Sequence, residues 1–405
     1  MPISNNPVVG RGLVVVRFAV MLKPLLRLDG ASIMRHLSVP SAQTQHWLER
    51  CRSEKWLAEH TGVSTLDDGN KAIPLNDSAP VEGDAVWMGL AVLELEAKGK
   101  APSHWTEHLD PELYLAHKED WPKAYETQGD VLIVKLEGSI WDAAETMADA
   151  MLTQLPSVRL VCADLGVQGD FRVRNLHPLA SRDGTIHTRT RIKENGYLLW
   201  VDPSKVYFSA RLSNERIETL ATAKRLFERL QRRIVVADPY AGVGPSMGAL
   251  LGEPDLLAGY HAGDLNPDAV DLLRENLTYL SRKRKDTNGD AALPLHPSTV
   301  VCSDATTWAL DEALKGSCDL LLINLPHDSI EHLPHVLPLL RPNQISVLRG
   351  WAIVERAQEA ERKRLIEDAI TQAGGRTESM TFHEVKGFSA SKSFVCFEAW
   401  IELAE

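Results

Sequence analysis

The chain has 405 residues, of which 44% are hydrophobic, so it is long enough to form two or three domains with buried cores. Its formal net charge of −11 excludes a polycation, and any contact with nucleic acid must therefore use a local basic patch. The 5 cysteines are scattered without a C-x-x-C pair, which argues against a disulfide framework or a zinc site and favours a reducing compartment.

The first 78 residues are predicted to form a small N-terminal domain. Residues 30–58 place apolar side chains at helical spacing and predict an amphipathic helix. Residues 76–84 are rich in turn-forming types and predict a linker to the next domain. No apolar run reaches the length of a transmembrane helix, so we expect no contact with a membrane.

Residues 1–28 carry basic side chains and no acidic one. This composition is found in organellar transit peptides, but it also fits an irregular start before a first strand, which is the interpretation that we favour. The expected location is therefore cytoplasmic, with a mitochondrial location as the alternative if the segment is a transit peptide.

Residues 85–205 are predicted to form an α+β domain, because helical and strand patterns alternate along them. The expected elements are helices at 85–99, 111–125 and 139–154, followed or separated by strands at 130–136 and 158–164.

A cationic stretch covers residues 170–193 within this domain. Its basic side chains outnumber the acidic Asp170 and Asp183; they are Arg172, Arg174, Arg182, Arg189, Arg191 and Lys193. Such a run is often only a solvated surface hairpin. The functional alternative is a face that contacts phosphates, because arginine and lysine supply many of these contacts.

Residues 206–405 predict a third domain built on a doubly wound sheet. A long helix is expected from Ser213 to about Arg232, and strands and helices alternate from Ile234 onward. The expected segments are 234–238, 245–252, 257–264, 267–280, 298–303, 318–323, 330–339, 344–349, 355–373, 378–385 and 393–402. The last two predict an antiparallel hairpin at the sheet edge.

The strongest local signal is the apolar run that ends at Asp238 and continues into a turn with Gly242 and Gly244. A strand that enters a glycine turn and then a helix is typical of nucleotide binding, although short glycine motifs also occur in ordinary turns. Asp264, Asp304 and Asn324 each follow a later predicted strand, so we expect all of these residues to line one crevice. The acids suit a ribose and an adenine amino group, and no lysine-containing phosphate loop is present. This combination favours S-adenosylmethionine over a nucleoside triphosphate.

The sequence resembles the archaeal and eukaryotic tRNA (guanine-37-N1)-methyltransferases from about residue 125 to the C-terminus, and more weakly over 35–80. The matching segments are Phe171–Arg174, Lys193–Gly196, Lys205–Leu212, Glu215–Arg216, Asp238–Pro245, Asp264–Pro267, Asn324–Pro326 and Val385–Phe388. The resemblance implies a class I Rossmann-like methyltransferase sheet over 206–405, preceded by an α+β domain that grips the anticodon stem-loop. It also implies a small N-terminal domain that touches the outer corner of tRNA, and a monomer.

The resemblance further implies roles for single residues. Glu215 is similar to the family's general base at guanine N1, Arg172 to the arginine that stabilises charge at O6, and Asn324 to the residue that holds the base edge. The implied cofactor-binding residues are Asp238, Tyr240, Gly242, Gly244, Asp264, Leu265, Asp304 and Asn324. The implied substrate-binding residues are Tyr207, Arg174, Arg211 and Pro326, and no metal site is implied.

The chemistry of guanine agrees with these roles. Guanine N1 keeps its proton near neutrality, so a base must remove this proton before N1 attacks a sulfonium methyl group. A cation near O6 would stabilise the charge that then develops. The target base must first leave its stack to reach such a pocket.

The sequence also departs from the family, with Ala210 where proline is usual, Ser246 where phenylalanine is frequent, and a long polar loop at 281–296. One alternative is the related wyosine-pathway enzyme, which transfers an aminocarboxypropyl group from the same cofactor. Pro245 and the Asn324-Leu-Pro turn argue against it, while methylation of a wyosine precursor stays open. An alternative of another class is a non-catalytic tRNA-binding protein that has kept the fold.

Overall fold

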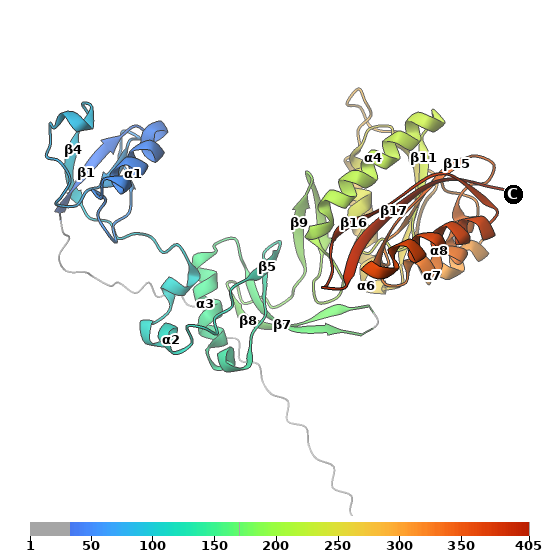
Figure 1. Cartoon of the computed structure of the whole chain (residues 1–405), viewed down its shortest axis with the longest axis horizontal. Coiled ribbons are helices and arrows are strands. Elements are labelled where there is room, and N and C mark those ends of the chain that lie inside the picture. The colour runs from blue at the N-terminus through green and yellow to red at the C-terminus, as the bar shows by residue number, and fades with distance from the viewer. Residues whose placement is uncertain (1–32, 170, 405) are drawn as a thin grey trace, which may run out of the picture. The chain divides into compact units, whose positions relative to one another are not determined.

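The computed structural model describes residues 33–169 and 171–404, so both interpretations of residues 1–28, an irregular start and a transit peptide, lie outside the described residues. The described chain divides into two compact units (Figure 1). One unit contains residues 33–118 together with 145–156, and the other contains residues 119–144 together with 157–404. No helix in the described ranges is long and apolar enough to cross a membrane.

The N-terminal sheet has the strand order β2-β3-β1-β4, and its neighbouring strands are antiparallel. The strands are β1 (Ile33–Val39), β2 (Ser64–Thr65), β3 (Lys71–Pro74) and β4 (Val92–Glu96), and helix α1 is Thr44–Ser53. Trp47 of α1 packs against Trp87, with ring centroids 6.1 Å apart. This pair forms the centre of a small apolar core.

The predicted helix at 30–58 is wrong in its first third, which is strand β1. Ile33 and Leu37 are four residues apart, and this spacing puts both side chains on one face of a strand as well as on one face of a helix. The predicted linker at 76–84 and helix at 85–99 are also wrong. Asp84 caps a 3₁₀ helix, Ala85–Trp87, whose tryptophan is fully buried, and the sheet continues into β4 beyond residue 78.

Two further helices belong to this N-terminal unit, α2 (Pro111–Ala116) and α3 (Ala144–Gln154). Helix α2 starts at Asp110, whose side chain accepts hydrogen bonds from the backbone N–H groups of Glu112 and Leu113. It is much shorter than the predicted 111–125, because the chain continues into strand β5 at Tyr125.

The second sheet has the order β5-β6-β7-β8 and carries part of the cationic stretch. Its strands are β5 (Tyr125–Gln128), β6 (Val131–Val134), β7 (Leu160–Gln168) and β8 (Val173–Ser181). The predicted strands at 130–136 and 158–164 are therefore confirmed. Strands β9 (Thr190–Glu194) and β10 (Tyr197–Val201) form a separate antiparallel hairpin that leads into the large sheet's domain.

The large sheet has the order β13-β12-β11-β14-β15-β17-β16, with β17 antiparallel to both of its neighbours. Its strands are β11 (Ile234–Asp238), β12 (Leu257–Asp264), β13 (Ser298–Cys302), β14 (Leu320–Ile323), β15 (Ile345–Glu355), β16 (Gly375–Gly387) and β17 (Lys392–Leu403). The predicted C-terminal hairpin is confirmed, and β16 is the edge strand.

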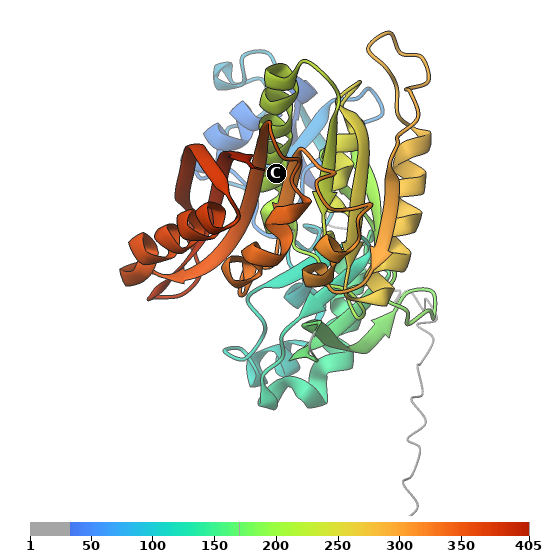
Figure 2. The ribbon, with the colours of Figure 1, turned by 90° about the vertical axis from the view of Figure 1, so that its right-hand side faces the viewer.

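Helices cover both faces of this sheet (Figure 2). They are α4 (Ser213–Leu230), α5 (Pro245–Gly252), α6 (Pro267–Arg282), α7 (Ser329–Val336) and α8 (Glu359–Gln372). Helices α4, α5 and α6 share one apolar core, and α7 and α8 share the other. The apolar run of β11 is buried along its whole length, as expected for a parallel strand covered on both sides.

We predict that Trp87→Ala lowers the free energy of unfolding of the N-terminal unit by about 3–5 kcal/mol, because it leaves a large cavity in a small core. Differential scanning calorimetry would measure the loss as an earlier transition. Val81→Ala is the control, since Val81 is exposed in the same unit. Equal transitions for the two variants would contradict this packing.

Candidate active site

The predicted site residues lie at the carboxyl ends of neighbouring parallel strands. Asp238 ends β11, Asp264 ends β12, and Asn324 follows β14, on the far side of β11. Strand β12 leads outward on one side of β11 and β14 on the other, so the chain order reverses here. A reversal of this kind opens a ligand crevice at the carboxyl ends of the strands.

The glycine turn forms one wall of this crevice. Gly242 and Gly244 have φ angles of +55° and +84°, which side chains other than glycine rarely adopt. A Cβ atom on Gly244 would lie 2.6 Å from Leu273 Cδ1, whereas Gly242 has only the Tyr207 carbonyl nearby, at 4.0 Å. The space in front of Gly242 is therefore open to a ligand, with the backbone of Tyr207 beside it; Tyr207 itself is 61% exposed.

Asp264 holds the turn through its carboxylate. It accepts hydrogen bonds from the backbone N–H groups of Gly242 and Asn266, both at 2.9 Å. Burial raises the pKa of Asp264 above its ordinary value. The next residue, Leu265, is 55% exposed and offers an apolar surface beside the carboxylate.

Asp238 is almost completely buried, with 2% of its surface exposed, and its Oδ1 atom has no hydrogen-bond partner among the described residues. Burial, followed by the charge of Asp264, raises the pKa of Asp238 to about 7. Such a buried acid supports the turn from behind more than it offers oxygens to a ligand. A cofactor with hydroxyl groups would instead meet Asp264.

Two other predicted cofactor residues lie next to the crevice strands. Asp304 caps the 3₁₀ helix Ala305–Leu310 by accepting from the backbone N–H of Thr306 at 2.9 Å, and hydrogen bonds from Thr306 lower the pKa of its carboxyl. The Tyr240 hydroxyl lies 2.8 Å from Nδ1 of His332. Burial raises the pKa of this tyrosine hydroxyl.

Glu215 stands in the first turn of α4 and is 8% exposed. Its Oε2 atom accepts hydrogen bonds from Trp351 Nε1 at 2.9 Å and from Arg349 Nη2 at 3.1 Å. Arg349 also donates through Nη1 to Glu398 at 2.7 Å. Two buried carboxylates thus share one buried guanidinium.

Strand β15, which contains Arg349 and Trp351, also lies beside the Asn324 turn. Ile323 pairs with Gly350 in the parallel ladder, so Trp351 is the next residue along beside Asn324. The Pro326 carbonyl accepts from the backbone N–H of Ile353 at 2.7 Å, which fixes the turn to the same strand. The structure therefore brings Glu215 and Asn324 to the same end of the sheet, at the carboxyl end of β14.

Arg172 lies at the tip of the β7–β8 hairpin with a φ angle of +52°. Burial first, and then the positive charge of Arg172, lower the pKa of His327. His327 follows directly after Asn324-Leu-Pro326 in the chain. The charge of Arg172 therefore acts on the residue that directly follows the Asn324-Leu-Pro326 turn.

The two other predicted substrate arginines are tied into the fold. Arg174 pairs with Glu126 at 2.7 Å and lies 3.9 Å from Asp164. The charge of Arg211 also acts on Glu126. Arg174 is therefore a partly neutralised cation, which weakens the prediction that it contacts phosphate.

Several residues that build the site were missed by the sequence analysis. Arg349 places a charge in the middle of the mostly apolar strand β15, and this charge is a signal that could have marked it. Trp351 fits the apolar pattern of the strand and carried no such signal. The Lys193–Gly196 motif has a structural role, an ion pair, that the spacing of its residues could not reveal. Its Glu194 forms a buried ion pair with Arg216 at 2.6 Å, which joins the β9–β10 hairpin to α4.

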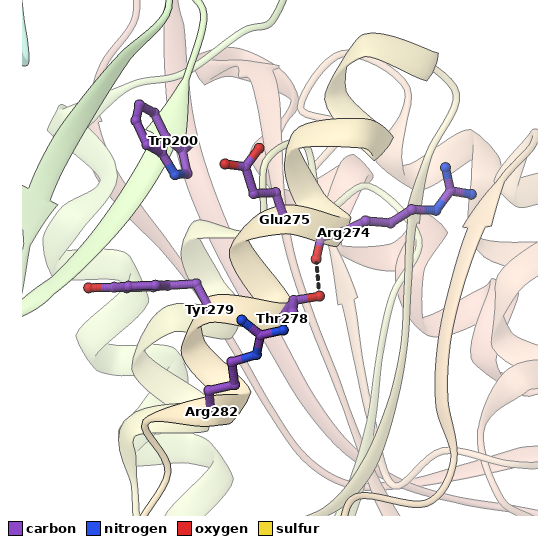
Figure 3. Close-up of a pocket in the computed structure, with 6 residues that line it drawn as sticks. All are labelled: Trp200, Arg274, Glu275, Thr278, Tyr279 and Arg282. Carbon is purple, nitrogen blue, oxygen red and sulfur yellow. Dashed lines mark hydrogen bonds between the residues drawn. The ribbon is translucent and has the colours of Figure 1, made fainter.

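The described residues contain no group of three or more histidine, cysteine, aspartate or glutamate side chains that could hold a metal ion. A surface pocket lined by Trp200, Glu275 and Arg282, among others, lies along α6 and is separate from the strand-end crevice (Figure 3).

Two ranges of this chain are similar to known protein families. Residues 190–288 match the model of the TRM5/TYW2 methyltransferase domain, and residues 105–184 match that of the TYW2 N-terminal domain. The sheet and its crevice therefore belong to the Rossmann-like methyltransferase class, as predicted. Within that class, the matched residues are similar to the TRM5/TYW2 methyltransferase domain and to the TYW2 N-terminal domain.

Curated relatives carry the name tRNA (guanine(37)-N(1))-methyltransferase. Trm5b of Methanocaldococcus jannaschii is 34% identical over 155 residues, which is 38% of this chain and 42% of the relative. The enzyme of Aedes aegypti is 32% identical over 293 residues, covering 71% of this chain and 47% of the relative. The chain thus spans less than half the length of these two relatives.

Solved structures share the fold across most of the chain. Trm5b from Pyrococcus abyssi aligns with a TM-score of 0.60 at 20% identity, covering 91% of this chain and 100% of that one. The complex of aTrm5 with tRNALeu gives 0.63 at 20% identity, covering 90% and 99%. TYW2 of P. horikoshii with MeSAdo gives 0.56 at 18% identity, covering 73% and 96%.

We predict that Asp238→Asn removes a pH dependence of stability. Because the folded-state pKa of Asp238 is about 7 and its ordinary value is 3.8, the folded protein binds the extra proton between these values. The free energy of unfolding of the wild type should therefore fall, relative to Asp238→Asn, as pH rises through this window. Urea unfolding at several pH values measures this change in the free energy of unfolding, and Asp368→Asn, at an exposed position, is the control. If the free energies of wild type and Asp238→Asn changed in parallel with pH, the raised pKa of Asp238 would be refuted.

We also predict that Arg349→Met lowers the free energy of unfolding by about 3–5 kcal/mol, because two buried carboxylates lose their shared cation. Arg225→Met removes a more exposed partner of Glu398 and should cost less than about 1 kcal/mol. Adding Glu398→Gln to Arg349→Met should restore part of the loss. Similar losses for the two arginine variants would argue against a buried network.

Proposed function

We propose that this protein transfers a methyl group from S-adenosylmethionine to N1 of guanine at position 37 of tRNA. The observation that carries the proposal is the position of Glu215, a buried carboxylate held by Trp351 and Arg349 beside the Asn324 turn. The names of the curated relatives, which are tRNA (guanine(37)-N(1))-methyltransferases, support this choice of substrate. Related structures that contain adenosine or MeSAdo support the choice of cofactor.

The residues of the crevice suit S-adenosylmethionine. Asp264 would accept hydrogen bonds from ribose hydroxyls, and Leu265 would pack against the adenine. The open space before Gly242 lets the ligand approach the backbone closely, next to Tyr207. The bound cofactor would supply a methyl group activated by a sulfonium.

Glu215 would then accept the proton from guanine N1, so that the N1 lone pair becomes available to bond the methyl carbon. The rigid hydrogen bonds from Trp351 and Arg349 keep the carboxylate in one orientation for this transfer. Arg172, at the hairpin tip, would stabilise the negative charge that develops on O6. Asn324 offers an amide that matches the donor and acceptor pattern of a guanine edge.

We further propose that the second sheet and its cationic hairpin hold the anticodon stem-loop, that the N-terminal unit touches the outer corner of the tRNA, and that the protein acts as a monomer. These proposals follow the family resemblance and the complex of aTrm5 with tRNALeu.

A second candidate function is the transfer of the aminocarboxypropyl group of the same cofactor to a wyosine precursor. The match of residues 105–184 to the TYW2 N-terminal domain favours it. Mass spectrometry of nucleosides from tRNA treated with the protein and S-adenosylmethionine separates the two functions. 1-Methylguanosine from unmodified tRNA supports the first proposal, and the larger adduct from tRNA that carries the wyosine precursor supports the second. The absence of both products refutes both.

We predict that Glu215→Gln lowers the single-turnover methylation rate by about 10²–10⁴-fold, because the amide cannot accept the N1 proton. The Kd for S-adenosylmethionine, measured by calorimetry, should stay as in the wild type. Glu218→Gln is the matched control, since Glu218 lies on the same helix with its side chain exposed. A Glu215→Gln rate equal to that of the control would remove the general-base assignment.

A further inference from the structure

A second cationic surface lies along the outer side of the β9–β10 hairpin and helix α6. It contains a pocket of about 390 Å³, lined by Trp200, Arg274, Glu275, Thr278, Tyr279 and Arg282 (Figure 3). Helix α6 begins at Pro267, next to Asp264 of the crevice. At about 3.6 residues per turn, the pocket residues lie roughly two to four turns further along the helix. The surface is therefore distinct from the methyl-transfer site.

The hairpin presents a row of cations on one face. Along β9, buried Thr190, Ile192 and Glu194 alternate with exposed basic residues. The exposed residues are Arg189, directly before the strand, and Arg191 and Lys193 within it. The row is therefore set by the period of a strand, with one face in the core and the other in solvent.

Trp200 orders two of these arginines. It pairs with Arg191 across the hairpin. The guanidinium carbons of Arg189 and Arg191 lie 4.6 and 5.0 Å from the centroid of its ring. Arg189 also pairs with Glu275 of α6 at 2.6 Å. Cation–π contacts of this kind hold side chains that would otherwise sample many rotamers.

Trp200 is itself anchored by the fully buried Asn276 of α6. The Asn276 side chain accepts from the Trp200 backbone N–H at 2.8 Å and donates to the Trp200 carbonyl at 3.0 Å. It also donates to the Val243 carbonyl at 2.9 Å. The hairpin, the helix and the glycine turn are thereby fixed to one another, and the guanidiniums are preorganised.

The end of α6 adds further cations to the same surface. Arg282 lines the pocket, and Lys283 lies over the Tyr279 ring at 4.4 Å. Cations at a helix C-terminus suit the helix dipole, which would be a sufficient explanation for these two alone. It does not explain the row on β9. In a chain of net charge −11, this concentration of ordered cations on two elements requires another explanation.

We propose that the surface formed by Arg191, Trp200, Tyr279, Arg282 and Lys283 binds the sugar–phosphate backbone of RNA outside the nucleotide that is methylated. Guanidinium groups match phosphate oxygens in a bidentate geometry, and preordered ones lose less entropy on binding. The identity of the RNA as the tRNA substrate rests on the proposed function. An acidic protein is the competing occupant, and the binding test below separates the two.

The test uses the double variant Arg191→Glu/Arg282→Glu of the full chain. Its matched control is Lys363→Glu/Arg364→Glu on α8, which makes the same change in net charge elsewhere. The Kd for unmodified tRNA is measured by filter binding over a range of salt concentrations. We expect the Kd of the first variant to rise at least tenfold and the slope of log Kd against log salt to fall by roughly 1.4–1.8, as for two lost phosphate contacts.

Two further measurements isolate the surface from the crevice. The cofactor Kd and the turnover at saturating tRNA should be unchanged in Arg191→Glu/Arg282→Glu. Trp200→Leu should weaken tRNA binding because the arginines lose their ordering ring, and Trp200→Phe should restore most of it. The proposal is overturned if Arg191→Glu/Arg282→Glu binds tRNA as tightly as the wild type or as tightly as the α8 control. That result is the one expected if the surface binds an acidic protein instead of RNA.

The failure of this proposal is distinguishable from failure of the proposed function. A wild-type protein that methylates guanine while the surface variants bind tRNA normally rejects the surface only. A wild-type protein that binds tRNA in a surface-dependent way and yields no methylated guanosine rejects the proposed function only.

Discussion

The structure of the candidate site depends on one buried ionic network. Glu215 of α4 and Glu398 of β17 share the guanidinium of Arg349 on β15. Burial alone would raise the pKa of Glu398, but hydrogen bonds from Thr222 and Trp400 and the charges of Arg349 and Arg225 bring it below its ordinary value. Charges buried this deeply are tolerated only when they are paired, so helix and sheet must keep their relative positions. The network thus fixes the position of the Glu215 carboxylate.

The same constraint explains how distant parts of the chain meet. Helix α4 is joined to the β9–β10 hairpin by the Arg216–Glu194 pair, and the hairpin is joined to α6 through Asn276. Strand β15 ties the Glu215 network to the Asn324 turn through the ladder that pairs Ile323 with Gly350. Glu215 is therefore held in a rigid frame. Arg172, by contrast, lies at the tip of a hairpin.

The sequence predicted the large sheet well because its signals are local. The apolar run before Asp238 and the turn at Gly242 and Gly244 specify a strand, a turn and a helix within a few residues. The N-terminal region was predicted poorly because the spacing of Ile33 and Leu37 fits helix and strand alike. In addition, Trp87 lies in the predicted helix 85–99, where the structure has only a short 3₁₀ helix. The Glu215–Arg349 contact joins residues 134 apart, so no local pattern could reveal it. The ion pair of Arg174 with Glu126 was not predicted either, because these two residues are also far apart in the sequence.

The central claim is that the Glu215 carboxylate meets the target guanine at N1. A structure of the protein with S-adenosylhomocysteine and an unmodified anticodon stem-loop, determined by crystallography or electron microscopy, tests it most directly. The account predicts a flipped guanine whose N1 lies within about 2.6–3.2 Å of a Glu215 oxygen, with O6 facing Arg172. A guanine bound with N1 turned away from Glu215, or a base held outside the Asn324 turn, would contradict it.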